Sequence, residues 1–253
     1  MYMLCGIGGA GRKNGQKERT DLDWFVEILA TFLAVVAVLT LHEFAHAFVA
    51  YKCGDPTAKW AGRMTLNPVK HFDSVGLVCF VFVGFGWAKP VPVNEANFRK
   101  YRSGCFWTSA AGVITNYLSA FLFYPLFILA LRFYLGADTL TYGHEFLYYL
   151  TEYLYMYSLS FCVFNLLPFY PLDGFRIVEA ASKKHGAVYR FLRDYGYKIL
   201  IGLIAESWLC DMLLRLTGAP IFAYINLLDY IMSFATGIFA YPITWLWNTV
   251  FKI

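Results

Sequence analysis

Two histidines and a glutamate lie close together in the sequence His-Glu-Phe-Ala-His, at residues 42–46. On a helix, His42 and His46 are four residues apart and share one face, so both imidazoles can reach the same zinc ion. Glu43 lies beside them, where it could accept a proton from a water molecule bound to that metal. These residue types at this spacing predict a zinc hydrolase in which Glu43 is the general base.

A zinc site that keeps one position open for water needs a third protein ligand. Three further histidines are available, and we expect all of them in loops: His71, His144 and His185. Asp173 is the better candidate, because it follows an apolar run over 146–170 at a point where Pro168 and Pro171 would end a helix and redirect the chain. The Asp-Gly pair at this position is also compatible with an ordinary turn.

The motif lies inside an apolar segment rather than on an amphipathic helix. Residues 24–41 precede it and are apolar over a length sufficient to enter a bilayer. HExxH can occur by chance in a helix, but ionisable side chains at membrane depth are costly and are generally functional. A zinc-hydrolase motif in this setting indicates proteolysis within the membrane.

The composition is that of a polytopic membrane protein. Of the 253 residues, 59% are hydrophobic and only 15% are charged, and the mean hydropathy is +0.50. Apolar stretches recur at about 24–50, 105–131, 146–170, 199–218 and 220–250. We therefore expect an all-α fold with about five transmembrane helices. The six cysteines form no CxxC pair, and the basic residues are dispersed over loops, so neither a disulfide framework nor a nucleic-acid surface is indicated.

The loops differ in charge. Residues 51–73, 88–104 and 173–198 together hold 14 of the 21 Lys and Arg residues, and the positive-inside rule predicts that these loops face the cytoplasm. The apolar run between the first two, Ser74–Trp87, should then enter and leave on the same side. With the Gly- and Pro-containing segment Gly84–Asn94 it should form a re-entrant β-hairpin that lines the site and holds an unwound substrate.

This reading divides the chain into three parts. Residues 1–23 form a disordered basic N-terminal tail, residues 24–180 the metalloprotease core, and residues 181–253 a cytoplasmic loop with C-terminal transmembrane helices.

Four motifs in this order resemble the site-2 protease family of intramembrane metalloproteases in its short bacterial form: HEFAH, GRMTLNPVKHFD (62–73), GFGWAKPVPVN (84–94) and NLLPFYPLDG (165–174). The resemblance covers roughly residues 24–180. It implies that one Zn²⁺ per chain is bound by His42, His46 and Asp173, with Glu43 as general base. It also implies that Asn165 helps to hold the substrate carbonyl or its oxyanion, although Asn165 could instead cap backbone groups freed by the prolines.

The chain departs from the family pattern in the following helix. The family usually has Gly-Pro and then Asn there, whereas this sequence has Gly112, Val113 and then Asn116. From the residues alone, Asn116 is better explained as an interhelical hydrogen-bonding group than as a catalytic one.

The function implied by the resemblance is intramembrane zinc endopeptidase activity on the transmembrane segments of membrane proteins. The substrate would be a single-span membrane protein, such as an anti-sigma factor or a signal-peptide remnant. The protein would lie in the lipid bilayer of the bacterial cytoplasmic membrane, with a site accessible from the cytoplasm. Two alternatives are a transporter with an intramembrane ion path and a non-catalytic scaffold. The metal-ligand pattern and the lack of an internal repeat argue against the first, and the intact Glu43 argues against the second.

Overall fold

The computed structural model describes residues 21–73, 75–76, 88–182 and 186–252. Within these residues the chain is helical. The α-helices are α1 (Asp21–Cys53), α2 (Thr57–Trp60), α4 (Tyr101–Leu135), α5 (Tyr142–Leu166), α6 (Asp173–Ala181), α7 (Ala187–Thr217), α8 (Ile221–Tyr224) and α9 (Leu227–Phe251), and the 3₁₀ helices are η2 (Pro68–Lys70) and η3 (Glu95–Asn97). Three of them, α1, α4 and α9, are long and apolar enough to cross a membrane.

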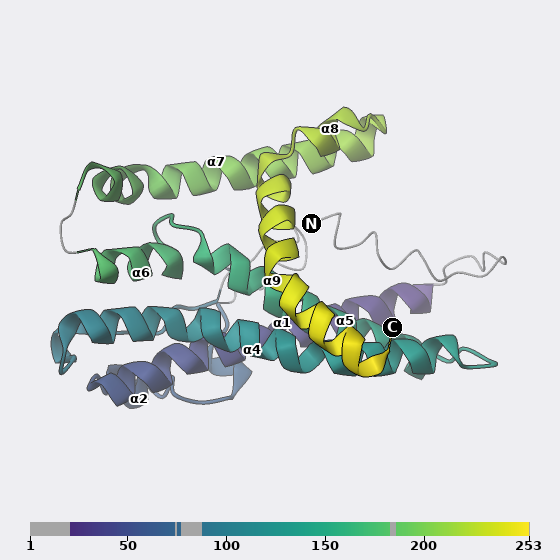
Figure 1. Cartoon of the computed structure of the whole chain (residues 1–253), viewed down its shortest axis with the longest axis horizontal. Coiled ribbons are helices and arrows are strands. Elements are labelled where there is room, and N and C mark those ends of the chain that lie inside the picture. The colour runs from purple at the N-terminus through teal and green to yellow at the C-terminus, as the bar shows by residue number, and fades with distance from the viewer. Residues whose placement is uncertain (1–20, 74, 77–87, 183–185, 253) are drawn as a thin grey trace.

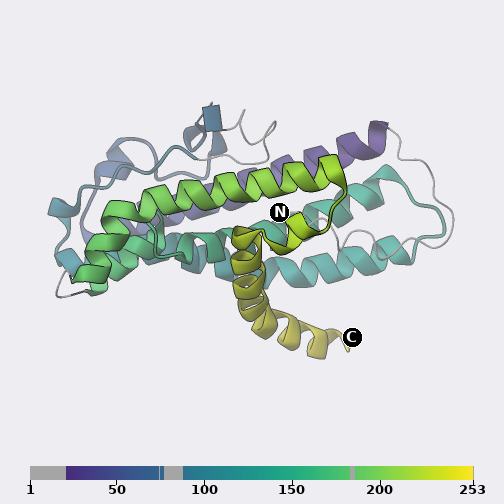
Figure 2. The ribbon, with the colours of Figure 1, turned by 90° about the horizontal axis from the view of Figure 1, so that it is seen from above.

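Helices α1, α4 and α5 run side by side and pack against one another (Figures 1 and 2). Many of the buried residues of α1 and α4 are small. On α1 they include Ala30, Ala34, Ala47 and Ala50, and on α4 they include Ser109, Ala110, Ala111 and Gly112. Small residues let helix backbones approach closely, which is the usual basis of helix packing in membranes. The histidine motif of α1 is therefore held close to the backbone of α4.

Helix α9 crosses α4 and α5 at a steep angle (Figure 1). Ile243 is fully buried in an aromatic cluster with Tyr124 and Tyr155. The Trp247 indole donates a hydrogen bond to the Phe121 carbonyl oxygen at 2.9 Å. Much of the remaining surface of α9 is exposed and apolar, as expected of a helix that contacts lipid.

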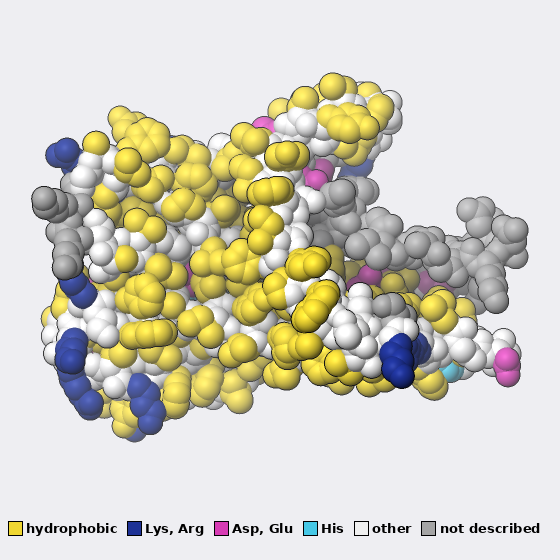
Figure 3. Space-filling view, in the orientation of Figure 1, with side chains coloured by type: hydrophobic (Ala, Val, Ile, Leu, Met, Phe, Trp, Pro, Cys, Tyr) yellow, Lys and Arg dark blue, Asp and Glu magenta, His cyan; other side chains and the backbone are white. Residues whose placement is uncertain are grey.

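Hydrogen bonds and ion pairs tie the three basic loops together at one end of the bundle. The buried Asp55 carboxylate accepts hydrogen bonds from the Asn94 backbone N–H at 2.7 Å and from the Asn97 side-chain amide at 2.8 Å. Arg102 donates to the Ser182 carbonyl oxygen at 3.0 Å. In Figure 3, Lys and Arg side chains gather at the left-hand end, where Figure 1 shows α2 and α6, and hydrophobic side chains cover much of the rest of this face. The side of the membrane that this end faces stays a prediction.

The expected number of transmembrane helices is wrong. Among the described residues three helices, rather than about five, have the length and hydropathy of a membrane span. Helix α5 carries Glu145 and Glu152, and α7 carries Glu206 and Asp211 among several basic residues. Many of the apolar residues counted in the α5 segment are tyrosines, which favour the membrane interface over the hydrocarbon core.

The expected re-entrant β-hairpin is also not supported. The described residues contain no β-strand, and one isolated antiparallel bridge joins Phe72 to Ala88. Pro90 and Pro92 have no N–H and cannot donate to a β-ladder, and the Pro90 carbonyl oxygen accepts a hydrogen bond from Arg63 instead. Residues 74 and 77–87 lie outside the described residues, as does the predicted N-terminal tail up to residue 20.

Candidate metal centre

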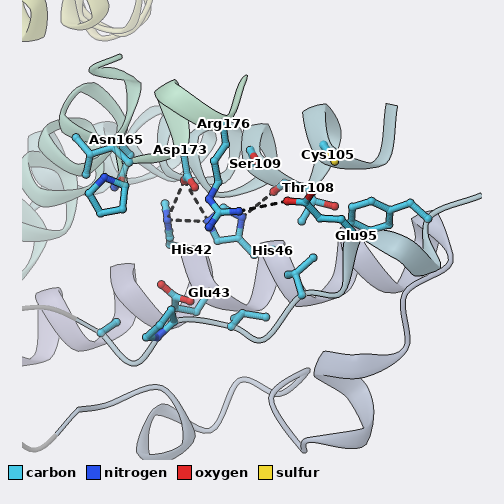
Figure 4. A pocket seen from close by; sticks show the side chains of 17 residues that line it. His42, Glu43, His46, Glu95, Cys105, Thr108, Ser109, Asn165, Asp173 and Arg176 are labelled. Atoms are coloured by element: carbon cyan, nitrogen blue, oxygen red, sulfur yellow. Dashed lines mark hydrogen bonds and ion pairs between the residues drawn. The ribbon is translucent and has the colours of Figure 1, made fainter. Parts of the chain in front are cut away.

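The two histidines of α1 and Asp173 of α6 converge on one point (Figure 4). The Nε2 atoms of His42 and His46 lie 2.9 Å apart, and Oδ2 of Asp173 lies 3.4 Å from the first and 3.2 Å from the second. Donor atoms bound to one tetrahedral zinc ion are about 3.3 Å apart. The three atoms are therefore spaced like three donors of such a site. In the part of the chain that the structure describes, no other group of His, Cys, Asp and Glu residues has this arrangement.

The turn after α5 and the start of α6 set the position of Asp173, which is the first residue of α6. The next residue is Gly174, and a Cβ atom there would lie 2.3 Å from the Leu166 carbonyl oxygen and 2.5 Å from that of Leu167. Only glycine lets α6 begin this close to the end of α5. The Asp-Gly pair is thus more than a turn signal, because its glycine allows the aspartate to lie over the histidines.

The buried carboxylate of Asp173 is suited to bind a cation. Its Oδ2 atom is buried and has no hydrogen-bond partner among the described residues. In the metal-free chain burial raises the pKa of this carboxyl, but the charge of a protonated His46 and the contact with His42 outweigh it and hold the pKa well below the ordinary range. A bound cation would take the place of that charge. A buried carboxylate aligned with two imidazole nitrogens is the donor set that zinc takes in proteins.

Helix α4 contacts the histidines from the side opposite their own helix. The Nδ1 atom of His46 lies 2.7 Å from the Thr108 carbonyl oxygen, and Nδ1 of His42 lies 3.1 Å from Nδ2 of Asn116. Between these two contacts is Gly112, where a Cβ atom would come within 2.4 Å of His42 Cε1 and 2.5 Å of His46 Nε2.

Sequence reasoning missed the contact made by Thr108, identified Gly112 only as part of a family motif, and interpreted Asn116 as an interhelical hydrogen-bonding group without a link to the histidines. The sequence does contain an indication of these contacts, because Thr108, Gly112 and Asn116 are spaced four residues apart and so lie on one face of α4.

A cavity of about 480 Å³ opens beside the three candidate ligands. Glu43 lines it and lies on the opposite side of the two imidazoles from Asp173 in Figure 4. Asn165, in the last turn of α5, also lines it, and its amide nitrogen donates to the Phe161 carbonyl oxygen at 3.1 Å. The structure thus brings the five predicted site residues to one cavity. Their roles in binding and catalysis stay predictions.

Two further charged residues line the same cavity and were not expected from the sequence. Arg176 of α6 pairs with Glu95 of η3 at 3.5 Å. The Tyr101 hydroxyl donates to the same glutamate at 2.8 Å. These contacts join the loop after residue 88 to the helix that begins with Asp173. Nothing in the local sequence pattern indicates this pairing, because the two residues are 81 positions apart.

The remaining histidines of the described residues are elsewhere. His71 is buried, and its Nε2 atom contacts the Thr65 carbonyl oxygen at 2.7 Å. His144 forms a capping box with Thr141 at the start of α5. Neither belongs to the ligand group, and His185 lies outside the described residues.

Curated relatives of the chain bear metalloprotease names. It is 42% identical over 147 residues to the "Putative zinc metalloprotease YwhC" of Bacillus subtilis (strain 168), a match that covers 58% of this chain and 66% of that protein. It is 30% identical over 161 residues to the "Putative zinc metalloprotease Rip2" of Mycolicibacterium smegmatis, covering 60% of this chain and 58% of the relative. The Rip2 protein of Mycobacterium tuberculosis is 31% identical over 161 residues, with 61% and 57% covered. The chain belongs to the site-2 protease family.

Membership of this family agrees with the apolar helices α1, α4 and α9, and the chain is a membrane protein. It spans between 57% and 66% of the length of these curated site-2 protease relatives. No protein-family model matches the chain. No solved structure matches it either.

Proposed function

We propose that this site-2 protease homologue is an intramembrane zinc endopeptidase that cleaves the transmembrane segments of membrane proteins. The observation that carries the proposal is the convergence of His42, His46 and Asp173 next to Glu43 in one cavity. The motif belongs to α1, which is long and apolar enough to cross a membrane. The names of the curated relatives support the same chemistry.

His42, His46 and Asp173 would hold the zinc ion. Zinc at this position supplies Lewis acidity, which acidifies a water molecule and polarises a peptide carbonyl. Glu43 accepts the proton of that water and passes it to the leaving amine, which is the usual role of a carboxylate beside such a site. Its place on the cavity wall, away from Asp173, leaves it available for this transfer.

Asn165 would stabilise the negative charge that develops on the carbonyl oxygen. One N–H of its amide is used by the Phe161 carbonyl oxygen. A primary amide has two N–H groups, so the second can donate to the substrate. A donor of this kind is worth about 10²–10³ in rate.

The proposed substrate is a single-span membrane protein. The peptide groups of a transmembrane helix are hydrogen-bonded within the helix, so the substrate must unwind before its carbonyl can be attacked. The cavity is lined by Glu95 and Arg176, at the end of the bundle that holds the basic loops. If that end faces the cytoplasm of a bacterium, as the positive-inside rule predicts, water reaches the site from the cytoplasmic side.

Substitution of the general base tests the proposal. Glu43→Gln keeps the shape of the side chain but cannot accept a proton, so it should abolish cleavage of a tagged single-span reporter in detergent while leaving the zinc content unchanged. Glu179→Gln, at a glutamate of α6 that does not line the cavity, is the matched control and should cleave normally. Undiminished cleavage by Glu43→Gln would falsify the metalloprotease mechanism.

A further inference from the structure

Asn116 is a fully buried amide in the middle of α4, a helix long and apolar enough to span a membrane. Its Nδ2 atom lies 3.1 Å from Nδ1 of His42. Its Oδ1 atom is buried without a hydrogen-bond partner among the described residues. An unpaired polar atom at this depth costs folding free energy. Packing alone would favour an apolar side chain here, so the amide calls for another explanation.

The positions of the protons on the two histidines explain why an amide is needed at Asn116. Both Nε2 atoms point at Asp173, and a metal binds the lone pair of a neutral imidazole nitrogen. Each Nδ1 atom must then carry the proton and needs an acceptor, because the partner of that N–H fixes the tautomer and orients the ring. For His46 the acceptor is the Thr108 carbonyl oxygen at 2.7 Å.

For His42, the contact recorded at Nδ1 is with the carboxamide of Asn116. An amide nitrogen has two N–H groups and cannot accept, whereas the amide oxygen can. A half-turn of the amide exchanges the two atoms and brings Oδ1 to the imidazole as an acceptor, while the amide nitrogen takes the position that has no partner among the described residues. We propose that Asn116 is a positioning residue whose Oδ1 accepts the Nδ1–H of His42 and thereby presents the Nε2 lone pair of His42 to the metal.

The register between the two helices supports this role. Thr108 and Asn116 are eight residues apart on α4, two steps of four along one face, and they meet His46 and His42, which are four apart on α1. Gly112, midway between them, has no side chain that would separate the helices. One face of α4 therefore orients both imidazoles. The inference rests on the proposed zinc site and adds a residue to it.

The alternative is that Asn116 only holds α1 and α4 together, and the two roles predict different results. We compare Asn116→Asp, which keeps an acceptor, with Asn116→Leu, which has a similar size but no polar atom. Ser119→Ala is the control, at a buried serine of α4 that is not among the residues lining the cavity. The full chain is purified in detergent, zinc affinity is measured by competition with a chelator, and the thermal midpoint is measured on the metal-free protein.

A positioning role predicts that Asn116→Leu weakens zinc binding about 10–100-fold without lowering the thermal midpoint of the metal-free protein. Asn116→Asp should bind zinc at least as tightly as the wild type, and Ser119→Ala should not differ from it. If the leucine variant does not fold, Asn116→Ala takes its place in the comparison.

Wild-type zinc affinity in Asn116→Leu would overturn the inference, and so would an equal loss in the aspartate and leucine variants. Absence of zinc from the wild-type chain would instead contradict the proposed function.

Discussion

Gly112 is the point at which α4 comes closest to the two imidazoles. Real Cβ atoms keep more than about 3 Å from their non-bonded neighbours, and a Cβ atom at this position would lie 2.4–2.7 Å from three imidazole atoms. The helix backbone cannot withdraw locally, because Ala111 and Val113 on either side are also buried. The imidazoles would have to move, and their movement would separate the donor atoms.

We therefore expect Gly112→Ala to lower zinc affinity at least tenfold, the lower end of the range for outer partners of a metal site. Gly237→Ala is a matched control in α9, where nothing lies within 4 Å of the added methyl group, and it should bind zinc as the wild type does. The zinc affinity of both variants is measured from their zinc content at graded chelator concentrations. Equal affinity in the two variants would contradict this role of Gly112.

The ligand residues themselves make a second prediction at this scale. The purified chain should hold about one zinc ion, and the double variant His46→Ala, Asp173→Ala should hold none at stoichiometric level, because two of the three donors are gone. His144→Ala, far from the site in the α5 capping box, should keep its zinc. Stoichiometric zinc in the double variant would rule out this ligand set.

The sequence predicts those features of the site that depend on residues close together in the chain. The spacing of His42 and His46 follows from helix geometry, and the prolines before Asp173 indicate a helix end. The Thr108 contact uses a backbone carbonyl, which any residue type could supply. Glycine is needed at position 112 because α1 and α4 lie very close together. The distance between these two helices depends on how they pack and cannot be predicted from the sequence of either one.

At the scale of elements, the loop that carries the cavity wall is held by one buried carboxylate. Asp55 is fully buried and accepts hydrogen bonds from Thr57, Asn94 and Asn97. It thereby ties the end of α1 to η3, which carries Glu95 at the cavity. Burial would raise the pKa of Asp55, but the hydrogen bonds, led by that of Thr57, outweigh this and lower the pKa below its ordinary value.

A carboxyl whose pKa is lower in the folded state stabilises the fold above its unfolded pKa and loses this contribution as the pH falls through the folded pKa. We expect Asp55→Asn to lower the free energy of unfolding by about 1–3 kcal/mol at pH 7. The difference from the wild type should be constant above pH of about 5 and should shrink below about 3.9, the ordinary pKa of the group. Unfolding midpoints in detergent from pH 3 to pH 7 measure it. A pH-independent difference would contradict the role of the charge.

The helices were easier to anticipate than their relation to the membrane. The apolar runs at 24–50 and 105–131 correspond to α1 and α4, because long apolar stretches have few other folds. The runs at 146–170 and 199–218 resemble spans only in the types of residue that they contain. In helix α5, Tyr148 and Tyr155 make aromatic contacts with α4. A tyrosine ring packs like an apolar side chain, but its hydroxyl lowers the mean hydropathy of the helix. The segment 88–94 could not be assigned correctly, because Arg63, distant in sequence, holds its carbonyl oxygens.

At the scale of the whole molecule, the basic loops lie at one end of the bundle and the turn after α4 lies at the other. Trp60 is highly exposed at the first end, and Leu140 is exposed at the second. In a background without native cysteines, Trp60→Cys should react with an impermeant thiol reagent from one side of the membrane and Leu140→Cys from the opposite side, because α4, which lies between them, is long and apolar enough to cross. Labelling of Trp60→Cys and Leu140→Cys from one side would contradict this topology.

The candidate ligands are far apart along the chain although they meet in space. His46 is made 127 residues before Asp173, and at a synthesis rate of 5–20 residues per second this interval is roughly 6–25 seconds. During that time α1 and α4 can insert and α5 can pack against them, but the donor set lacks its carboxylate. On the proposed function, a growing chain could not hydrolyse neighbouring proteins at the site of insertion. Its peptidase activity would begin only when α6 has docked against the end of α5, so completion of the donor set would itself act as the activation step.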